Sequence, residues 1–196
     1  DCATATELTL AQAAGVTGER VMLSSNDTPD ADFAQADAMG AIINLDSLDM
    51  VGCLERALGG RVPSRVCCRV NPGGTFEAAN GIIGNPEDAK FGMTVPQLEE
   101  AFRRLAALGV EDLGIHAFLA SNTQVDDYYP RLARTLFELA VRLHEELGVH
   151  VWLIDLSGGI GVDYRPEDRA ADISAIGEGV RRAFEEVLVP AGMGDV

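Results

Sequence analysis

Residues 149–161 read VHVWLIDLSGGIG and determine which folds the chain can adopt. The first part, Val149 to Leu156, is strongly apolar, which predicts a strand that is buried on both faces. Ser157, Gly158 and Gly159 follow at its carboxyl end. A strand buried on both faces needs other elements packed against both of its sides. This stretch therefore predicts an α/β domain that is built on a parallel sheet.

Strands and helices alternate along the rest of the chain. We expect strands at 1–3, 21–23, 41–45, 65–70, 113–117 and 149–156, and helices at 6–14, 29–39, 47–58, 94–108, 127–147 and 167–188. Thr94 and Gln97 have the spacing of a capping box at the start of the fourth helix. Right-handed crossovers between such strands are compatible with an open doubly wound sheet and with a barrel. The pattern of elements alone leaves that choice open.

Composition limits the partners of the protein. The formal net charge is −16 and the isoelectric point is about 4.4, so polyanions such as nucleic acids and anionic membranes are repelled. No apolar run approaches the roughly 18 residues that a membrane span needs. The four cysteines form no CxxC pair, and Cys67 and Cys68 are expected on opposite faces of a strand. We expect reduced thiols, a cytoplasmic protein and no metal site.

Two candidate ligand-binding segments follow predicted strands. The glycine-rich turn at 157–161 can present backbone N–H groups to an anion. Its spacing does not fit the G-x-G-x-x-G fingerprint of dinucleotide-binding folds, and a tight turn without a ligand is the alternative. His116, Phe118 and Ser121 follow another strand, where Ser121 could donate to a phosphate and Phe118 offers a flat apolar face. The alternative here is a buried histidine and a core aromatic.

Two further polar residues lie at predicted strand ends. Arg69 ends the strand at 65–70, and a buried arginine there usually has a carboxylate partner, so this pair could be purely structural. Asp1 lies at the end of the first predicted strand, with Glu7 in the following helical turn. A solvated helix cap is the alternative reading of Asp1.

The order of several motifs is more informative than any one of them. DCAT with TEL, then INLDS, CRVNPG, KFGM, GIHAFLASN and LSGGIGVDY run in order through the chain. This series resembles the fold-type III pyridoxal-phosphate-dependent decarboxylases that act on ornithine, arginine and diaminopimelate, and is most similar to those acting on diaminopimelate. The resemblance implies a partial (β/α)8 TIM-type barrel like that of alanine racemase, with about six of the eight βα units in residues 1–196.

The resemblance also implies where the phosphate of the cofactor, pyridoxal 5′-phosphate, is held. Ser157, Gly158 and Gly159 occupy the triple-glycine turn of the family, whose backbone amides bind this phosphate. Ser157 departs from the family glycine, and this costs little if its φ is negative. Ser121 matches a serine that also contacts the phosphate.

Four other residues match positions of the family's cofactor site. Asp1 and Arg69 match polar residues of the cofactor site, and His116 matches the first histidine of a two-histidine motif. Phe118 replaces the second histidine, which stacks on the ring in the family. A phenyl ring can stack in the same way, but it cannot donate a proton.

The resemblance places the catalytic groups outside this chain. The Schiff-base lysine is expected on a strand upstream of Asp1, and a glutamate for the ring nitrogen downstream of Val196, together with a last barrel strand and a C-terminal β-domain. Lys90, the only lysine, lies in a segment where the family forms no bond to the cofactor. No catalytic residue is therefore predicted within the chain. By itself the chain is expected to be inactive and prone to aggregate.

The function implied for the parent protein, the natural protein that contains this chain, is decarboxylation of meso-2,6-diaminopimelate to L-lysine in lysine biosynthesis. A homodimer with active sites at its interface is implied as well. Decarboxylation of ornithine, arginine or carboxynorspermidine is one alternative, and a non-catalytic relative that keeps the barrel is another. An open-sheet nucleotide-binding protein is disfavoured because the glycine fingerprint is absent.

Overall fold

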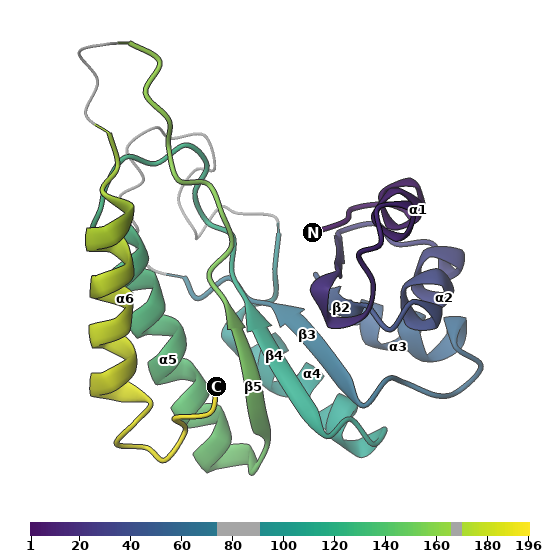
Figure 1. Cartoon of the computed structure of the whole chain (residues 1–196). Coiled ribbons are helices and arrows are strands. Elements are labelled where there is room, and N and C mark those ends of the chain that lie inside the picture. The colour runs from purple at the N-terminus through teal and green to yellow at the C-terminus, as the bar shows by residue number, and fades with distance from the viewer. Residues whose placement is uncertain (74–90, 166–169) are drawn as a thin grey trace.

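The computed structural model of the chain describes residues 1–73, 91–165 and 170–196, and its secondary structure alternates as predicted (Figure 1). The strands are β1 (Met22–Ser25), β2 (Ile42–Leu45), β3 (Arg65–Arg69), β4 (Asp112–His116) and β5 (His150–Asp155). The helices are α1 (Ala5–Ala13), α2 (Asp30–Ala38), α3 (Asp49–Ala57), α4 (Val95–Ala107), α5 (Tyr128–Leu147) and α6 (Ile173–Val187), with a 3-10 turn at Gly18–Arg20. Most of the predicted loop after β3, including Lys90, lies outside the described residues.

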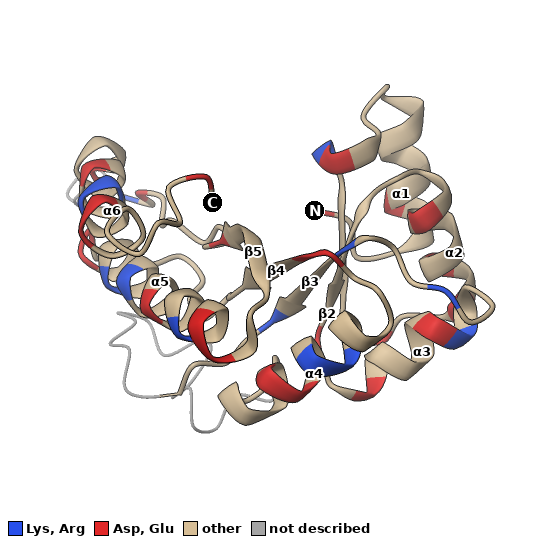
Figure 2. Cartoon of the chain, turned by 90° about the horizontal axis from the view of Figure 1, so that it is seen from below, with Lys and Arg blue, Asp and Glu red and all other residues tan. Residues whose placement is uncertain are grey.

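The order of the strands decides between the two folds that the pattern left open. Within the described residues, five parallel strands form one sheet in chain order, β1-β2-β3-β4-β5. A doubly wound sheet would reverse this order partway and carry helices on both faces. Figure 2 shows instead an open arc of strands with the helices along its outer side. The chain is a partial (β/α) barrel, as the resemblance implied.

Two predicted elements differ from the structure. The expected strand at 1–3 is a single bridge, in which the N–H of Cys2 donates to Met22 and its carbonyl accepts from Ser24, so the described strands number five and not six. The last helix begins at Ile173, because the side chain of Asp172 caps it by accepting from the N–H of Ala175, 2.9 Å away. Glu167, where we expected this helix to begin, lies outside the described residues.

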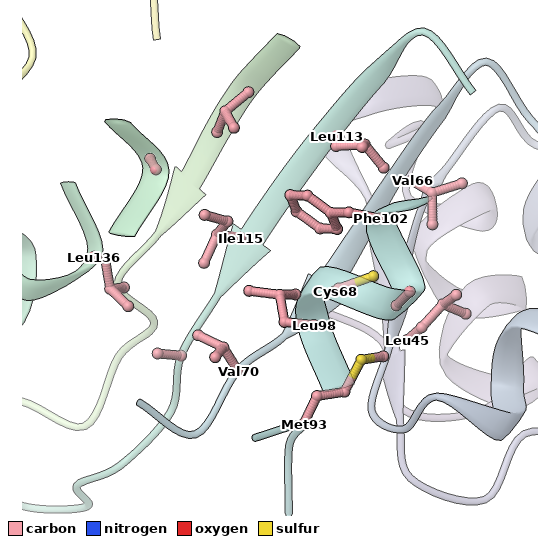
Figure 3. Close-up of a cluster of buried hydrophobic side chains, with 14 of the residues drawn as sticks. Leu45, Val66, Cys68, Val70, Met93, Leu98, Phe102, Leu113, Ile115 and Leu136 are labelled. Atoms are coloured by element: carbon pink, nitrogen blue, oxygen red, sulfur yellow. The ribbon is translucent and has the colours of Figure 1, made fainter. Parts of the chain in front are cut away.

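The main core fills the space between the sheet and its outer helices. Figure 3 shows Leu98 and Phe102 of α4 lying against Val66, Cys68 and Leu113 of β3 and β4. The predicted capping box starts this helix, with Gln97 accepting from the N–H of Thr94. No described helix has the length and apolar character that crossing a bilayer requires. Because side chains alternate between the two faces of β3, Val66 and Cys68 point outward and pack against α4 on the outer side of the sheet.

A smaller apolar cluster occupies the inner, concave face of the sheet. It consists of Met22, Ile42 and Cys67, with Trp152 and Leu153 packed against it. Cys67 belongs to this inner cluster while Cys68 belongs to the outer core, which confirms the prediction that the two point to opposite faces.

The β4–β5 pairing contains a register shift that sets which side chains reach the inner face. Leu113 pairs with Val151, but Gly114 pairs with Leu153, so Trp152 is an extra residue, as in a β-bulge. Trp152 and Leu153 therefore both pack on the inner cluster. Beyond the shift, Asp155 comes into register with His116. Without the extra residue, the alternation would have turned Asp155 to the helix-covered side.

Close packing of α5 on α6 leads to a first prediction, a loss of stability in Gly179→Ala. A Cβ at Gly179 would lie 2.4 Å from Cγ of Pro130, whose ring is rigid. We expect the free energy of unfolding to fall by roughly 1–3 kcal/mol, the range for overpacked sites. Gly177→Ala is the matched control, because a Cβ there meets no atom within 4 Å. The control should gain stability through better helix propensity. Equal denaturant midpoints for the two variants would refute the prediction.

Candidate functional site

A cavity of about 340 Å³ opens where β3, β4 and β5 end. It gathers seven of the eight residues that the sequence analysis assigned to cofactor binding: Asp1, Arg69, His116, Phe118, Ser157, Gly158 and Gly159. Ser121, the eighth, is not part of the lining. Its backbone lies beside Gly159, with its Cα 3.3 Å from where a Gly159 Cβ would stand. Residues that are far apart in the chain meet here because parallel strands end on the same side of a barrel.

A larger cavity, of about 450 Å³, lies between α5 and α6 and contains none of the predicted residues. Its arginines include Arg131, which pairs with Asp127 one turn earlier at the start of α5, and Arg134, which pairs with Glu186 across the two helices. These charges are already neutralised by their neighbours. We therefore assign the functional site to the cavity at the strand ends.

The glycine turn is held by the loop that follows β4. The N–H of Thr123 donates to the carbonyl of Gly159 at 2.9 Å, and the N–H of Gly161 donates to the carbonyl of Thr123 at 2.7 Å. Gly159 has a φ of 95°, and a Cβ on it would lie 2.4 Å from the carbonyl oxygen of Ala120. Glycine is thus required there on two grounds. Within the described residues, the N–H groups of Gly158 and Gly159 donate to no other group.

Ser157 adopts a left-handed backbone conformation, with a φ of 59°. The low cost that we expected depended on a negative φ, and the structure contradicts that condition. A left-handed residue with a Cβ costs about 1–2 kcal/mol. Two hydrogen bonds hold it there. Its N–H donates to Oδ1 of Asp155 at 2.7 Å, and its Oγ lies 2.6 Å from Nε2 of His116.

His116 ends β4 and is almost fully buried. Burial is the main cause that lowers the pKa of its imidazole from 6.5 to about 4; nearby Arg69 acts in the same direction, while Asp155 and Asp46 oppose the shift. At neutral pH the ring is therefore uncharged. Its Nδ1 has no hydrogen-bond partner among the described residues.

This shift predicts a loss of stability in weak acid. Below pH 6.5 the unfolded chain takes up a proton that the folded chain binds only near pH 4, so stability falls as the pH is lowered between these values. The expected loss from His116 reaches about 3 kcal/mol at pH 4. Chemical unfolding at a series of pH values should show this slope in the wild type. A His116→Gln variant with an equally steep slope between pH 6.5 and 4.5 would show that another group is responsible.

Arg69 has the carboxylate partner that its position suggested, and it is Asp46. Nη1 of Arg69 lies 3.0 Å from Oδ1 of Asp46, and both side chains are largely buried. Nη2 of Arg69 donates to the carbonyl of Phe118 at 3.1 Å. The guanidinium also lies 5.2 Å from the ring centroid of Phe91 and 5.8 Å from that of Phe118, within cation–π range. Arg69 thus fixes both the backbone and the ring of Phe118.

The remaining polar residues of the cavity come from the N-terminus of the chain and from β1. Asp1 and Glu7 line the cavity, and the Glu7 carboxylate accepts from the N–H of Ala3, just before the N-cap residue Thr4 of α1. Ser24 also lines it, and its Oγ accepts from Nδ2 of Asn44 at 2.9 Å. Sequence reasoning missed Ser24 and did not name Asp46. The only available signal was that Asp46 directly follows a predicted strand.

The cavity has the chemistry to bind a flat, anionic molecule. Its lining includes Ser157, Gly158 and Gly159, which carry donors, and it also includes Phe118 and Arg69. The described residues contain no group of histidine, cysteine and acidic side chains that could hold a metal ion. Backbone N–H groups can hold an anion locally, although the chain as a whole is acidic.

Comparison with known proteins gives consistent matches across the whole chain. The sequence profile described as "pyridoxal-dependent decarboxylase, pyridoxal binding domain" matches residues 1–194. Diaminopimelate decarboxylase of Methanothermobacter thermautotrophicus is 31% identical over 189 residues, covering 96% of this chain and 44% of that protein. Protein TabA of Pseudomonas amygdali pv. tabaci is 28% identical over 188 residues, covering 96% of this chain and 43% of that protein.

Solved structures agree on the fold. A mutant of diaminopimelate decarboxylase from Helicobacter pylori, in complex with L-lysine, superposes with a TM-score of 0.84 at 21% identity. The match covers 94% of this chain and 47% of that one. The chain thus spans less than half the length of the relatives it matches.

Proposed function

Because this chain belongs to the pyridoxal-dependent decarboxylases, through their pyridoxal-binding domain, we propose that it is the cofactor-binding part of an amino acid decarboxylase. The parent protein would convert meso-2,6-diaminopimelate to L-lysine and CO2, with pyridoxal 5′-phosphate as its cofactor. One observation carries the proposal. The family's phosphate turn, at Ser157 to Gly159, lines the same cavity as Arg69, His116 and Phe118.

The residues present fit this cofactor. The phosphate would be held by the N–H groups of Gly158 and Gly159, which have no acceptor within the described residues. Phe118 would cover one face of the pyridine ring, and Arg69 keeps Phe118 in place. Asp1 lines the same cavity. Ser121 would reach the phosphate from the loop beside Gly159.

The bound cofactor supplies an electron sink for the electron pair that remains when CO2 leaves the substrate. The part played by this chain is to bind and orient. The glycine turn fixes the phosphate end, and the apolar Phe118 ring excludes water from one face. His116, neutral at pH 7, can donate or accept a hydrogen bond without adding charge. Phe118 has no proton to give, so this position does not supply a proton to the product.

The test is to express the parent protein and measure cofactor binding and CO2 release. We expect visible absorbance from the bound cofactor. Borohydride should make the attachment of the cofactor irreversible, since the covalent lysine is proposed to lie upstream of Asp1. Labelled CO2 should be released from meso-diaminopimelate. A parent protein that binds the cofactor but releases no CO2 from any diamino acid would instead support a non-catalytic relative.

Related substrates are the second candidate function, and the same assay separates them. The curated relatives include several diaminopimelate decarboxylases, which favours diaminopimelate. A solved structure with the same fold is described as a lysine/ornithine decarboxylase complexed with cadaverine. Ornithine, arginine and carboxynorspermidine therefore belong in the substrate panel. The substrate that gives the highest kcat/KM identifies the activity.

The remaining expectations belong to the parent protein as a whole. We propose a cytoplasmic homodimer whose active sites lie at the subunit interface. The Schiff-base lysine, the last barrel strand and the C-terminal β-domain would lie outside residues 1–196. Size-exclusion chromatography with light scattering tests the dimer, and the sequence flanking this chain tests the missing parts.

A further inference from the structure

The hydrogen bond between His116 and Ser157 identifies which atom carries the imidazole proton. A neutral imidazole has one N–H, on Nδ1 or on Nε2. Nδ1 is buried and has no partner among the described residues, whereas Nε2 lies 2.6 Å from Oγ of Ser157. An orphaned buried N–H is rarer in folded proteins than an unpaired acceptor. The proton therefore belongs on Nε2, which donates to Ser157.

This assignment leaves the Ser157 hydroxyl hydrogen available. A serine oxygen that accepts one hydrogen bond can still donate its own hydrogen elsewhere. Ser157 lines the cavity together with Gly158 and Gly159, whose N–H groups are also available. Three donors then belong to consecutive residues in the lining of one cavity. Terminal oxygens of a phosphate are matching acceptors for such a group of donors.

We propose that Ser157 is a third hydrogen-bond donor to the cofactor phosphate and that His116 is the positioning residue that aims its hydroxyl. This inference rests on the proposed function, because it names a ligand within the same site. The left-handed backbone of Ser157 supports it, since strained conformations persist where the surrounding contacts fix them and they cluster at binding sites. Glycine at this position would remove the strain, but it would also remove the donor.

The test compares two ligands that differ only in the phosphate. Apo parent protein is titrated with pyridoxal 5′-phosphate and with pyridoxal, and Ser157→Gly and Ser157→Ala are compared with the wild type. Ser157→Gly keeps the backbone unstrained, so it guards against a folding defect. We expect both variants to bind pyridoxal 5′-phosphate about tenfold more weakly or worse, because a hydrogen bond to a charged group is lost. The affinity of both variants for pyridoxal should stay within about twofold of the wild-type value, since pyridoxal lacks the phosphate that accepts this hydrogen bond.

His116→Phe tests the positioning role separately. It removes the donor to Ser157 but leaves the serine in place, so the phosphate-specific loss should be smaller than in Ser157→Gly. Ser174→Ala is the matched control, because Ser174 is exposed on α6 and does not line the cavity. It should leave both affinities unchanged.

The outcomes separate this inference from the proposed function. If Ser157→Gly binds pyridoxal 5′-phosphate as tightly as the wild type, the hydroxyl is not a phosphate donor, while the proposed function stands. If both ligands weaken equally, Ser157 acts only through the shape of the turn and the inference is wrong. If the wild-type parent binds neither ligand, the proposed function itself fails and the inference falls with it.

Discussion

Gly159→Ala is expected to disrupt the phosphate turn and to abolish tight cofactor binding. The new Cβ would lie 2.4 Å from the carbonyl oxygen of Ala120, which is backbone and cannot rotate away. The φ of 95° at this position is also unfavourable for any residue with a Cβ. Clash and strain together should lower the free energy of unfolding by about 3 kcal/mol or more.

The effect on binding follows from the same geometry. To relieve the clash, the turn must move away from the loop after β4, which breaks the hydrogen bond from Thr123 to the Gly159 carbonyl. The N–H groups of Gly158 and Gly159 then no longer point together. We expect the affinity of the parent protein for pyridoxal 5′-phosphate to fall by at least roughly 100-fold, since two charge-assisted hydrogen bonds are lost.

Gly158→Ala is the control next in sequence. A Cβ on Gly158 meets no atom within 4 Å, and its φ is not in the left-handed region. Its unfolding midpoint in denaturant should therefore stay close to that of the wild type. Equal stability of the two alanine variants would show that the turn is loose and that the packing of Gly159 on Ala120 does not constrain it.

Arg69→Met is expected to lower the stability by a similar amount. It leaves the Asp46 carboxylate largely buried without its partner, which costs about 3–5 kcal/mol for a buried pair. The Phe118 carbonyl also loses its donor, and the Phe118 ring loses the guanidinium beside it. Cofactor affinity should fall as well, because Phe118 is then free to leave the cavity wall.

A double-mutant cycle measures how much of this loss belongs to the pair. Asp46→Leu combined with Arg69→Met should recover part of the stability, since no uncompensated charge remains buried. The surface pair of Arg56 and Asp30 is the control, with side chains 62% and 53% exposed. Arg56→Met should change stability little, because exposed pairs are screened by water. Additive losses in the Arg69 and Asp46 cycle would contradict a direct interaction.

The sequence by itself determined the fold class and predicted that most residues of the candidate site lie together. Apolar strands between amphipathic helices require a parallel sheet, and parallel strands bring their carboxyl ends together. That is why Arg69, His116 and Ser157, each at or just after a strand end, could be expected in one place. The choice of a barrel over an open sheet came only from the ordered motifs. The spacing of the predicted elements along the chain does not specify the order of strands across a sheet.

Only the tertiary structure decided which side chains meet and in which conformation. The extra residue Trp152 shifts the β4–β5 register and brings Asp155 beside His116, a change that alternation in the sequence cannot reveal. The pairing of Arg69 with Asp46 joins the ends of two strands, and the two residues are 23 positions apart in the sequence. The positive φ of Ser157 depends on its bonds to Asp155 and His116. Each of these features arises from contacts between strands, and a local pattern of residue types does not specify such contacts.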